Sequence, residues 1–269
     1  MYRYITFLTD FGLQDDFVGV CRGVIKRIAP DVSVLDITHG IPPQAVLQGA
    51  VVLANAVPYM PEAVHLAVVD PDVGSDRRAV ALRTRDGRAF VGPDNGLLTV
   101  AADAAGVDAA HELAETRYRL ERVSRTFHAR DVFAPAAAHL AAGVDIAALG
   151  PAVDPATLVR LPIPEPEVGA SQLQATVLAV DRFGNVQLNV RREHVGAVGL
   201  EPGDRVELGL ELDAYYAVVA ETFADAGAGE LILYEDSYGA YSIAISGGDA
   251  SALTGAQAGD AVRISPASE

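Results

Sequence analysis

Cysteine is almost absent from the chain: Cys21 is the single cysteine among 269 residues. One cysteine cannot form an intramolecular disulfide, which is typical of proteins from reducing compartments. Cys21 lies within an apolar pattern of helical period, so we expect a small buried side chain rather than a nucleophile. The fold must therefore be held by its core, and the length suffices to bury a large one.

An excess of positive charge is also lacking. Lys and Arg number 20 against 36 Asp and Glu, which gives a formal net charge of −16 at pH 7. Proteins that bind the phosphate backbone of nucleic acids present a basic face. We therefore expect no nucleic-acid partner.

Long apolar runs are missing as well. No run approaches the roughly 18 residues that a membrane-spanning helix needs. The first six residues lack the basic start and apolar middle of a signal peptide. We expect no membrane partner and a cytoplasmic location.

Strand and helix patterns alternate in the first half of the chain, as in α/β proteins with a mostly parallel sheet and covering helices. The patterns predict, in order, a strand at 3–9, a helix at 15–28, a strand at 32–37, a helix from Pro42 to 57, a strand at 64–69, a strand at 88–92 and an Ala-rich helix that ends at Gly143. We assign residues 1–150 to an N-terminal α/β domain.

Five prolines between Gly150 and Gly169 predict a linker over 151–170. Residues 171–269 then form a C-terminal domain of short strands that are separated by Gly-, Asp- or Pro-containing turns, which predicts a small β-barrel. The expected strands are 174–180, 185–190, 205–210, 215–220, 230–234, 241–245 and 261–264.

A carboxylate and a guanidinium flank the turn that follows the strand Leu66–Val69. Asp70 stands at the carboxyl end of that strand, where ligands gather in open α/β sheets. A tight hairpin through Pro71 and Gly74 would bring Arg77 back beside it. An Asp held by Arg stays ionised and oriented, as a base or a water-positioning group must be. The alternative is an ordinary ion pair in a surface turn.

A second acidic turn follows the first strand. Asp10 can direct two carboxylate oxygens at a vicinal diol, and Asp15 can accept a hydrogen bond from a ligand ammonium group. A capped helix with a solvated acidic turn is the simpler interpretation. A calcium site like that of nucleoside hydrolases is a third, but Leu8 stands where those proteins normally carry a further aspartate.

His128 precedes a helix and is either a structural hydrogen-bonding group or a partner of Asp70 and Arg77. The remaining histidines show no metal-binding spacing, so we expect no metal site. In the C-terminal half, Phe183 with Asn185, and the segment around Phe223, offer aromatic faces and an amide, which suit a purine. The alternative is that these segments are ordinary turns. Ser237 lies in a polar turn that can hold a carboxylate or an amine, although such a turn usually binds nothing.

Five segments match one family in order, and the chain resembles the S-adenosyl-L-methionine (SAM) hydroxide adenosyltransferases, relatives of the fluorinase and chlorinase. The matching segments are Leu-Thr-Asp-Phe-Gly at 8–12 with Asp at 15, Val-Asp-Pro at 69–71 with Arg at 77, Gly-Pro-Asp-Asn-Gly-Leu-Leu at 92–98, Thr-Phe-His at 126–128 with Arg-Asp-Val-Phe at 130–133, and Asp at 181 with Phe-Gly-Asn at 183–185.

The resemblance implies an N-terminal α/β domain joined to a β-barrel, in homotrimers whose active sites lie between subunits, with SAM as substrate and no cofactor. Asp70, Arg77 and His128 would orient the attacking water. The substrate-binding residues would be Asp10 for the ribose hydroxyls, Asp15 and Ser237 for the methionine end, Asn95, and Phe183, Asn185 and Phe223 around the adenine.

Our hypothesis from the sequence is hydrolysis of SAM to adenosine and L-methionine. The alternatives are a SAM-dependent halogenase, whose members often carry Tyr at the position of Asp70, and a non-catalytic SAM- or adenosine-binding sensor. Two positions depart from the hydrolase pattern, since Asp72 and Ala129 stand where glycine is common. Asp72 would add negative charge near the site, and Ala129 would narrow the water pocket.

Overall fold

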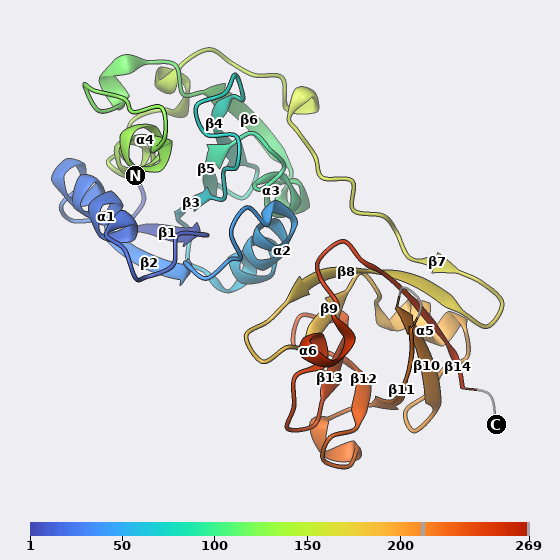
Figure 1. The fold of residues 1–269 in the computed structure, drawn as a ribbon. Helices are drawn as coiled ribbons and strands as arrows, with labels where there is room; N and C mark the ends of the chain where they lie inside the picture. Colours follow the sequence, from blue (N-terminus) through green and yellow to red (C-terminus); the bar gives the residue numbers. More distant parts are fainter. Residues whose placement is uncertain (211–212, 268–269) are drawn as a thin grey trace. The chain divides into compact units, whose positions relative to one another are not determined.

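The computed structural model describes residues 1–210 and 213–267 (Figure 1). The chain divides into two compact units, unit 1 at Met1–Leu161 and unit 2 at Pro162–Glu269. Each unit has its own hydrophobic core. No helix in the described part of the chain is both long and apolar enough to span a membrane.

Unit 1 is built on a six-stranded sheet in the order β2-β1-β3-β5-β4-β6. The strands are β1 Tyr4–Thr9, β2 Ser33–Thr38, β3 Val64–Val68, β4 Ala79–Thr84, β5 Ala89–Pro93 and β6 Val107–Glu112. Strands β2, β1, β3 and β5 are parallel, while β4 runs antiparallel to both of its neighbours. The prediction of a mostly parallel sheet is confirmed.

Helices cover both faces of this sheet (Figure 1). They are α1 Phe17–Ile28, α2 Val46–Ala56, α3 Thr99–Ala105 and α4 Ala134–Ala141, and a π-helical turn at Ala129–Phe133 leads into α4. Short 3₁₀ turns occur at Val57–Tyr59, Thr116–Tyr118, Ile146–Leu149 and Pro155–Thr157.

The alternating direction of side chains along β1 explains why helices pack on both faces of the sheet. Phe7 packs into the core shared with α1 and α4, whereas its neighbour Leu8 packs into the core shared with α2 and α3. Successive side chains of a strand point to opposite faces, so an unbroken apolar strand needs a cover on each.

The predicted tight hairpin through Pro71 and Gly74 is wrong. Strand β5 lies between β3 and β4, so the connection 69–78 passes over the carboxyl end of β5 instead of turning back directly. The residues of β5 are buried along its whole length, which suits the central place, whereas β4 exposes Arg83. Strand β6, at the sheet edge, was not predicted because its residues are small or polar.

The first part of the proline-rich segment packs against unit 1. The amide of Val159 donates to Asp94 Oδ1 at 2.9 Å, and Arg160 Nε donates to Asp103 Oδ2 at 2.7 Å. Leu158 is buried in the core under α2 and α3. Residues up to Leu161 therefore belong structurally to unit 1.

Unit 2 is a closed barrel of seven strands in the order β14-β10-β11-β12-β13-β9-β8, with β8 pairing back to β14. The strands of the unit are β7 Glu167–Val168, β8 Leu173–Val180, β9 Val186–Leu188, β10 Arg205–Leu210, β11 Asp213–Ala220, β12 Leu231–Glu235, β13 Tyr241–Ile245 and β14 Ala261–Pro266. Strand β7 is a short addition to β8. The predicted barrel is confirmed.

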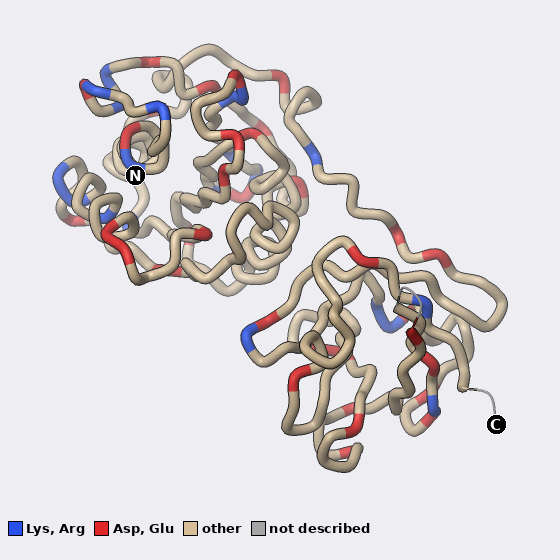
Figure 2. The backbone as a smooth tube through the Cα atoms, in the orientation of Figure 1, with Lys and Arg blue, Asp and Glu red and all other residues tan. Residues whose placement is uncertain are grey.

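Neighbouring barrel strands are antiparallel except β11 and β12, which are parallel. Two short helices, α5 Arg192–Ala197 and α6 Ala250–Thr254, and a 3₁₀ turn at Phe223–Asp225 lie in the connections. Acidic residues lie mostly in the turns and connections of this unit, as the red segments of Figure 2 show. The barrel interior is filled by alternate apolar side chains, such as Leu173, Ala175 and Val177 of β8.

Candidate active site

Three polar side chains from separate segments of unit 1 meet at the carboxyl end of β3. Arg77 Nε donates to Asp70 Oδ1 at 2.8 Å and Arg77 Nη2 donates to Asp70 Oδ2 at 2.5 Å. The same Nη2 lies 2.9 Å from His128 Nδ1. The guanidinium therefore holds the carboxylate in a two-pronged pair and also contacts the imidazole.

This cluster is largely shielded from water. The side chains of Asp70 and Arg77 are 6% and 8% exposed, and the guanidinium lies 5.1 Å from the centre of the Phe133 ring. A charge pair in such a place is retained because each member satisfies the other.

The imidazole of His128 is neutral and of one tautomer. Partial burial, followed by the nearby Arg77 charge, lowers the pKa of His128 below its usual value. Because the guanidinium has only donors, His128 Nδ1 must accept, which leaves the proton on Nε2. Nε2–H is thus a donor that Arg77 does not use.

The Asp70 loop closely approaches the segment that carries His128. Gly74 has a φ of +84°, and a Cβ there would lie 2.3 Å from the carbonyl oxygen of Arg125. A side chain at 74 would push the two segments apart, so glycine is needed for the approach as well as for the backbone conformation.

Asp131 stabilises the segment that carries His128 through hydrogen bonds. Its carboxylate, fully buried, accepts from the amide of Ser124 at 2.8 Å and from Arg130 Nε at 2.6 Å. It lies in the π-helical turn that directly follows His128. Such turns are rare and occur often at functional sites.

Asp10 and Asn95 lie at the same edge of the sheet as Asp70. Strands β1, β3 and β5 are parallel neighbours, and these residues follow their carboxyl ends. Asn95 Nδ2 donates to the carbonyl of Val69 at 2.8 Å, which ties its loop to the end of β3. Asp10 Oδ2 accepts from the amide of Gln44 at 2.9 Å.

Gln44 has an unusual backbone. Its φ of +66° makes it the single non-glycine residue with a positive φ in the described part of the chain. That conformation costs an L-residue about 1 kcal/mol or more. Here it aims the amide at Asp10.

Asp15 is exposed in the bend before α1. The rings of Phe11, Phe17 and Phe127 link the first loop to the His128 segment. Ring centres of Phe11 and Phe127 are 5.9 Å apart, and those of Phe17 and Phe127 are 5.2 Å apart, both edge to face. Asp15 itself is not brought into contact with Asp70.

The remaining four predicted residues lie in turns of unit 2. Phe183 is 75% exposed in the turn between β8 and β9. The side-chain amide of Asn185 donates to Asp181 Oδ2 at 2.7 Å, and the amide of Phe183 donates to Asp181 Oδ1 at 2.8 Å. Gly184 packs so closely on Asp249 that a Cβ would overlap it, so the turn is fixed.

Phe223 and Ser237 are exposed but also lie in braced turns. The Phe223 ring centre is 4.8 Å from that of Tyr234, and Asp225 accepts from two amides of the same turn. Asp236 organises the Ser237 turn, since its Oδ1 accepts from the amides of Tyr238 and Ala240.

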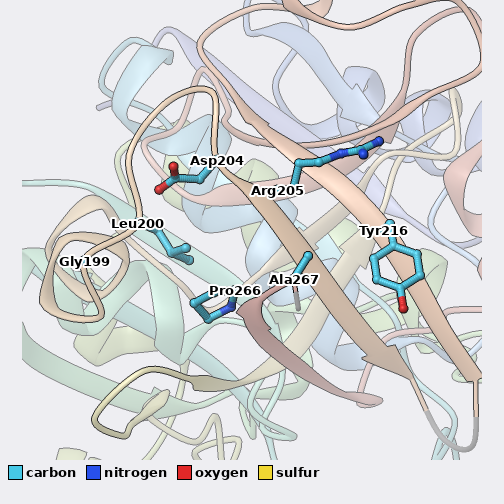
Figure 3. A pocket seen from close by; sticks show the side chains of 7 residues that line it. All are labelled: Gly199, Leu200, Asp204, Arg205, Tyr216, Pro266 and Ala267. Carbon is cyan, nitrogen blue, oxygen red and sulfur yellow. The ribbon is translucent and has the colours of Figure 1, made fainter. Parts of the chain in front are cut away.

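A broad surface hollow of about 740 Å³ lies in unit 2 (Figure 3). Its lining consists of Gly199, Leu200, Asp204, Arg205, Tyr216, Pro266 and Ala267. It contains none of the candidate residues, and the buried polar groups that would favour a ligand site there are lacking among its lining residues.

Comparison with known proteins gives this arrangement a context. Residues 5–150 match the family described as SAM hydroxide adenosyltransferase N-terminal domain, and residues 175–263 match its C-terminal domain. The chain belongs to the SAM hydroxide adenosyltransferase family.

Relatives in the family include hydrolases and fluorinases. An (R)-S-adenosyl-L-methionine hydrolase from Salinispora tropica is 50% identical over 262 residues, with 97% of each chain covered. A fluorinase from Actinopolyspora mzabensis is 30% identical, with 89% of each chain covered. A crystal structure of an uncharacterized conserved protein from Thermotoga maritima matches with a TM-score of 0.89 at 37% identity, covering 97% of this chain and 99% of that one.

Sequence reasoning missed the residues that hold the candidates in place. Asp131 belongs to one of the five family segments, and an aspartate among apolar helix residues was the signal that could have indicated its role. The role of Gln44 could not be predicted from the sequence, because its backbone amide and not its side chain contacts Asp10.

Proposed function

We propose that the protein hydrolyses SAM, in the (R) configuration at sulfur, to adenosine and L-methionine. The observation that carries the proposal is the hydrogen-bonded contact of Asp70, Arg77 and His128 at the end of β3. The names of the 50%-identical relatives support the same reaction.

The chemistry needs a positioned water rather than a strong acid. Water attacks the ribose C5′ in line with the C–S bond, and methionine leaves as a neutral thioether, so the leaving group needs no proton. One proton is released for each SAM consumed. What the site must supply is orientation and a desolvated setting for the sulfonium.

Each member of the triad has a distinct part in this proposal. Asp70 keeps free lone pairs beside those that Arg77 occupies and accepts a hydrogen bond from the water. His128 Nε2–H donates to the water oxygen. Arg77 keeps the carboxylate ionised and fixes the imidazole tautomer.

We propose substrate contacts from the resemblance to the family. Asp10 binds the ribose hydroxyls, Asp15 and Ser237 bind the methionine end, and Asn95 binds the substrate beside Asp70. Phe183, Asn185 and Phe223 surround the adenine.

We also propose a cytoplasmic homotrimer in which a neighbouring subunit completes each site. The assignment follows from the resemblance, which places Phe183 and Phe223 around the adenine, and both side chains are exposed in unit 2.

A halogenase is the second candidate, because fluorinases are among the relatives. Asp70 favours the hydrolase, since its negative charge repels an incoming halide.

The test is incubation of the purified protein with each sulfur epimer of SAM, with and without chloride, followed by chromatography. Adenosine from the (R) epimer supports the proposal, and ¹⁸O from labelled water must appear in its 5′-hydroxyl. A chlorinated nucleoside, or binding without turnover, would reject it.

Asp70→Ala should abolish turnover and retain substrate binding. Asp76→Ala is the matched control, because Asp76 is an exposed carboxylate in the same loop. Equal activity of the two variants would reject the role of Asp70.

A further inference from the structure

Two buried Thr–His pairs share strand β1. Thr9 Oγ1 lies 2.8 Å from His39 Nδ1, and Thr6 Oγ1 lies 2.8 Å from His65 Nδ1. His39 is 5% exposed and the other three residues are fully buried. Burial lowers the pKa of both histidines to about 4, so both rings are neutral near pH 7.

Only the first pair reaches the turn that carries Asp10. The carbonyl of His39 accepts from the amide of Gly12 at 2.7 Å, and Thr9 Oγ1 accepts from the amide of Phe11 at 3.2 Å. Phe11 and Gly12, the two residues after Asp10, are therefore both hydrogen-bonded to the Thr9–His39 pair.

The second pair lies inside the sheet. Thr6 and His65 are register partners of β1 and β3, three residues before Thr9. The two pairs match in chemistry and burial, but only the Thr9–His39 pair is hydrogen-bonded to the turn that carries Asp10.

The hydrogen bonds of the first pair have a definite direction. His39 Nε2 lies 3.2 Å from Asp36 Oδ1, without the alignment of a hydrogen bond, and Asp36 pairs with Arg22. A lone pair facing that carboxylate would be repelled, so the proton lies on Nε2. His39 Nδ1 then accepts from the Thr9 hydroxyl, whose oxygen remains an acceptor for Phe11.

We propose that Thr9 and His39 are positioning residues for Asp10, which fix the direction in which its carboxylate meets the ribose hydroxyls. The Gln44 amide donates to the Asp10 carboxylate itself. The inference rests on the proposed function, in which Asp10 binds the ribose.

The experiment compares kcat/KM for SAM and for an analogue that lacks the 2′- and 3′-hydroxyls. His39→Leu should lower kcat/KM for SAM at least tenfold and for the analogue by less than about threefold, because the analogue has nothing for Asp10 to bind. His39→Asn should recover most of the loss, since its amide oxygen can replace Nδ1 as an acceptor.

The matched control is His65→Leu, which removes the same hydrogen bond from the second pair. It should change the ratio between the two substrates by less than about threefold. Equal effects of His39→Leu and His65→Leu, or an equal loss on both substrates, would overturn the inference.

If His39→Leu does not fold, Thr9→Val replaces it, with Thr9→Ser as the rescue and Thr6→Val as the control. Calorimetric binding of adenosine and of 2′,3′-dideoxyadenosine gives the same ratio without turnover. A wild-type protein that binds adenosine but hydrolyses no SAM would thus reject the proposed function and still test the inference.

Discussion

At the scale of the residue, Arg77 must contact two different side chains at once. One guanidinium pairs with the carboxylate of Asp70 through two nitrogens and donates to His128 through one of them. A planar group with five donors can do both at once, whereas an ammonium group is a point charge that cannot match this geometry.

Arg77→Lys should therefore lower kcat about a hundredfold while the free energy of unfolding changes little, because charge is kept and orientation is lost. Steady-state kinetics and urea denaturation test this. Arg78→Lys is the neighbouring control, since Arg78 pairs with Asp94 away from the triad. Equal kcat values for wild type and Arg77→Lys would contradict the role of the paired hydrogen bonds from Arg77 to Asp70.

Gln44 offers a second prediction at this scale. Gln44→Gly should be neutral or stabilise the protein by up to about 1 kcal/mol, because glycine adopts the positive φ without strain and keeps the amide that Asp10 accepts from. Gln44→Val should destabilise by about 1 kcal/mol or more, because a branched side chain strains that conformation. Thermal unfolding of the two variants gives the comparison.

The sequence predicted which side chains would form the triad but not what orients them. Asp70 and Arg77 could be inferred from a strand end and a turn, and His128 from its motif. Asp131 and Gln44 could not, because their roles depend on contacts between segments that only the folded chain brings together.

At the scale of the element, the π-helical turn before α4 connects stability to the site. Its Asp131 carboxylate binds the Ser124 amide on the far side of His128. Asp131→Ala should cost about 2 kcal/mol, because the half-buried amide of Ser124 and the guanidinium of Arg130 lose their fully buried acceptor.

The same variant should speed amide hydrogen exchange over residues 124–128. Asp145→Ala is the control: Asp145 accepts from the amide of Ala147 in an exposed cap, so its loss should cost about 1 kcal/mol or less and leave that segment unchanged. Unchanged amide hydrogen exchange over residues 124–128 in Asp131→Ala would contradict the proposed link between the π-helical turn and the His128 segment.

Elements with strong periodicity were predicted well, and those without it were missed. The seven barrel strands followed from alternating apolar residues between turns, and α1 from its apolar stripe. Strand β6 and helices α5 and α6 are short and weakly patterned. The place of β5 between β3 and β4 depends on long-range pairing, which local sequence does not encode.

At the scale of the whole molecule, the buried histidines make stability depend on pH. Burial lowers the pKa of His39 and of His65 from 6.5 to about 4. Between these values the unfolded chain binds protons that the folded chain does not, so the free energy of unfolding falls as the pH is lowered.

The expected slope is about 1.4 kcal/mol per pH unit for each histidine between about pH 6.5 and pH 4. Urea denaturation at several pH values measures it, and replacing both histidines should flatten the curve over that window. A wild-type stability that stays constant from pH 6.5 to pH 4.5 would contradict this.

A ring of strands with an odd count cannot alternate up and down all the way around, so at least one neighbouring pair must point the same way. Here that pair is β11 and β12. The chain must consequently travel back along the barrel over residues 221–230 before β12 begins. Phe223 lies on this obligatory return path, so shortening it to a tight turn would reverse β12 and make it parallel to β13 instead of β11.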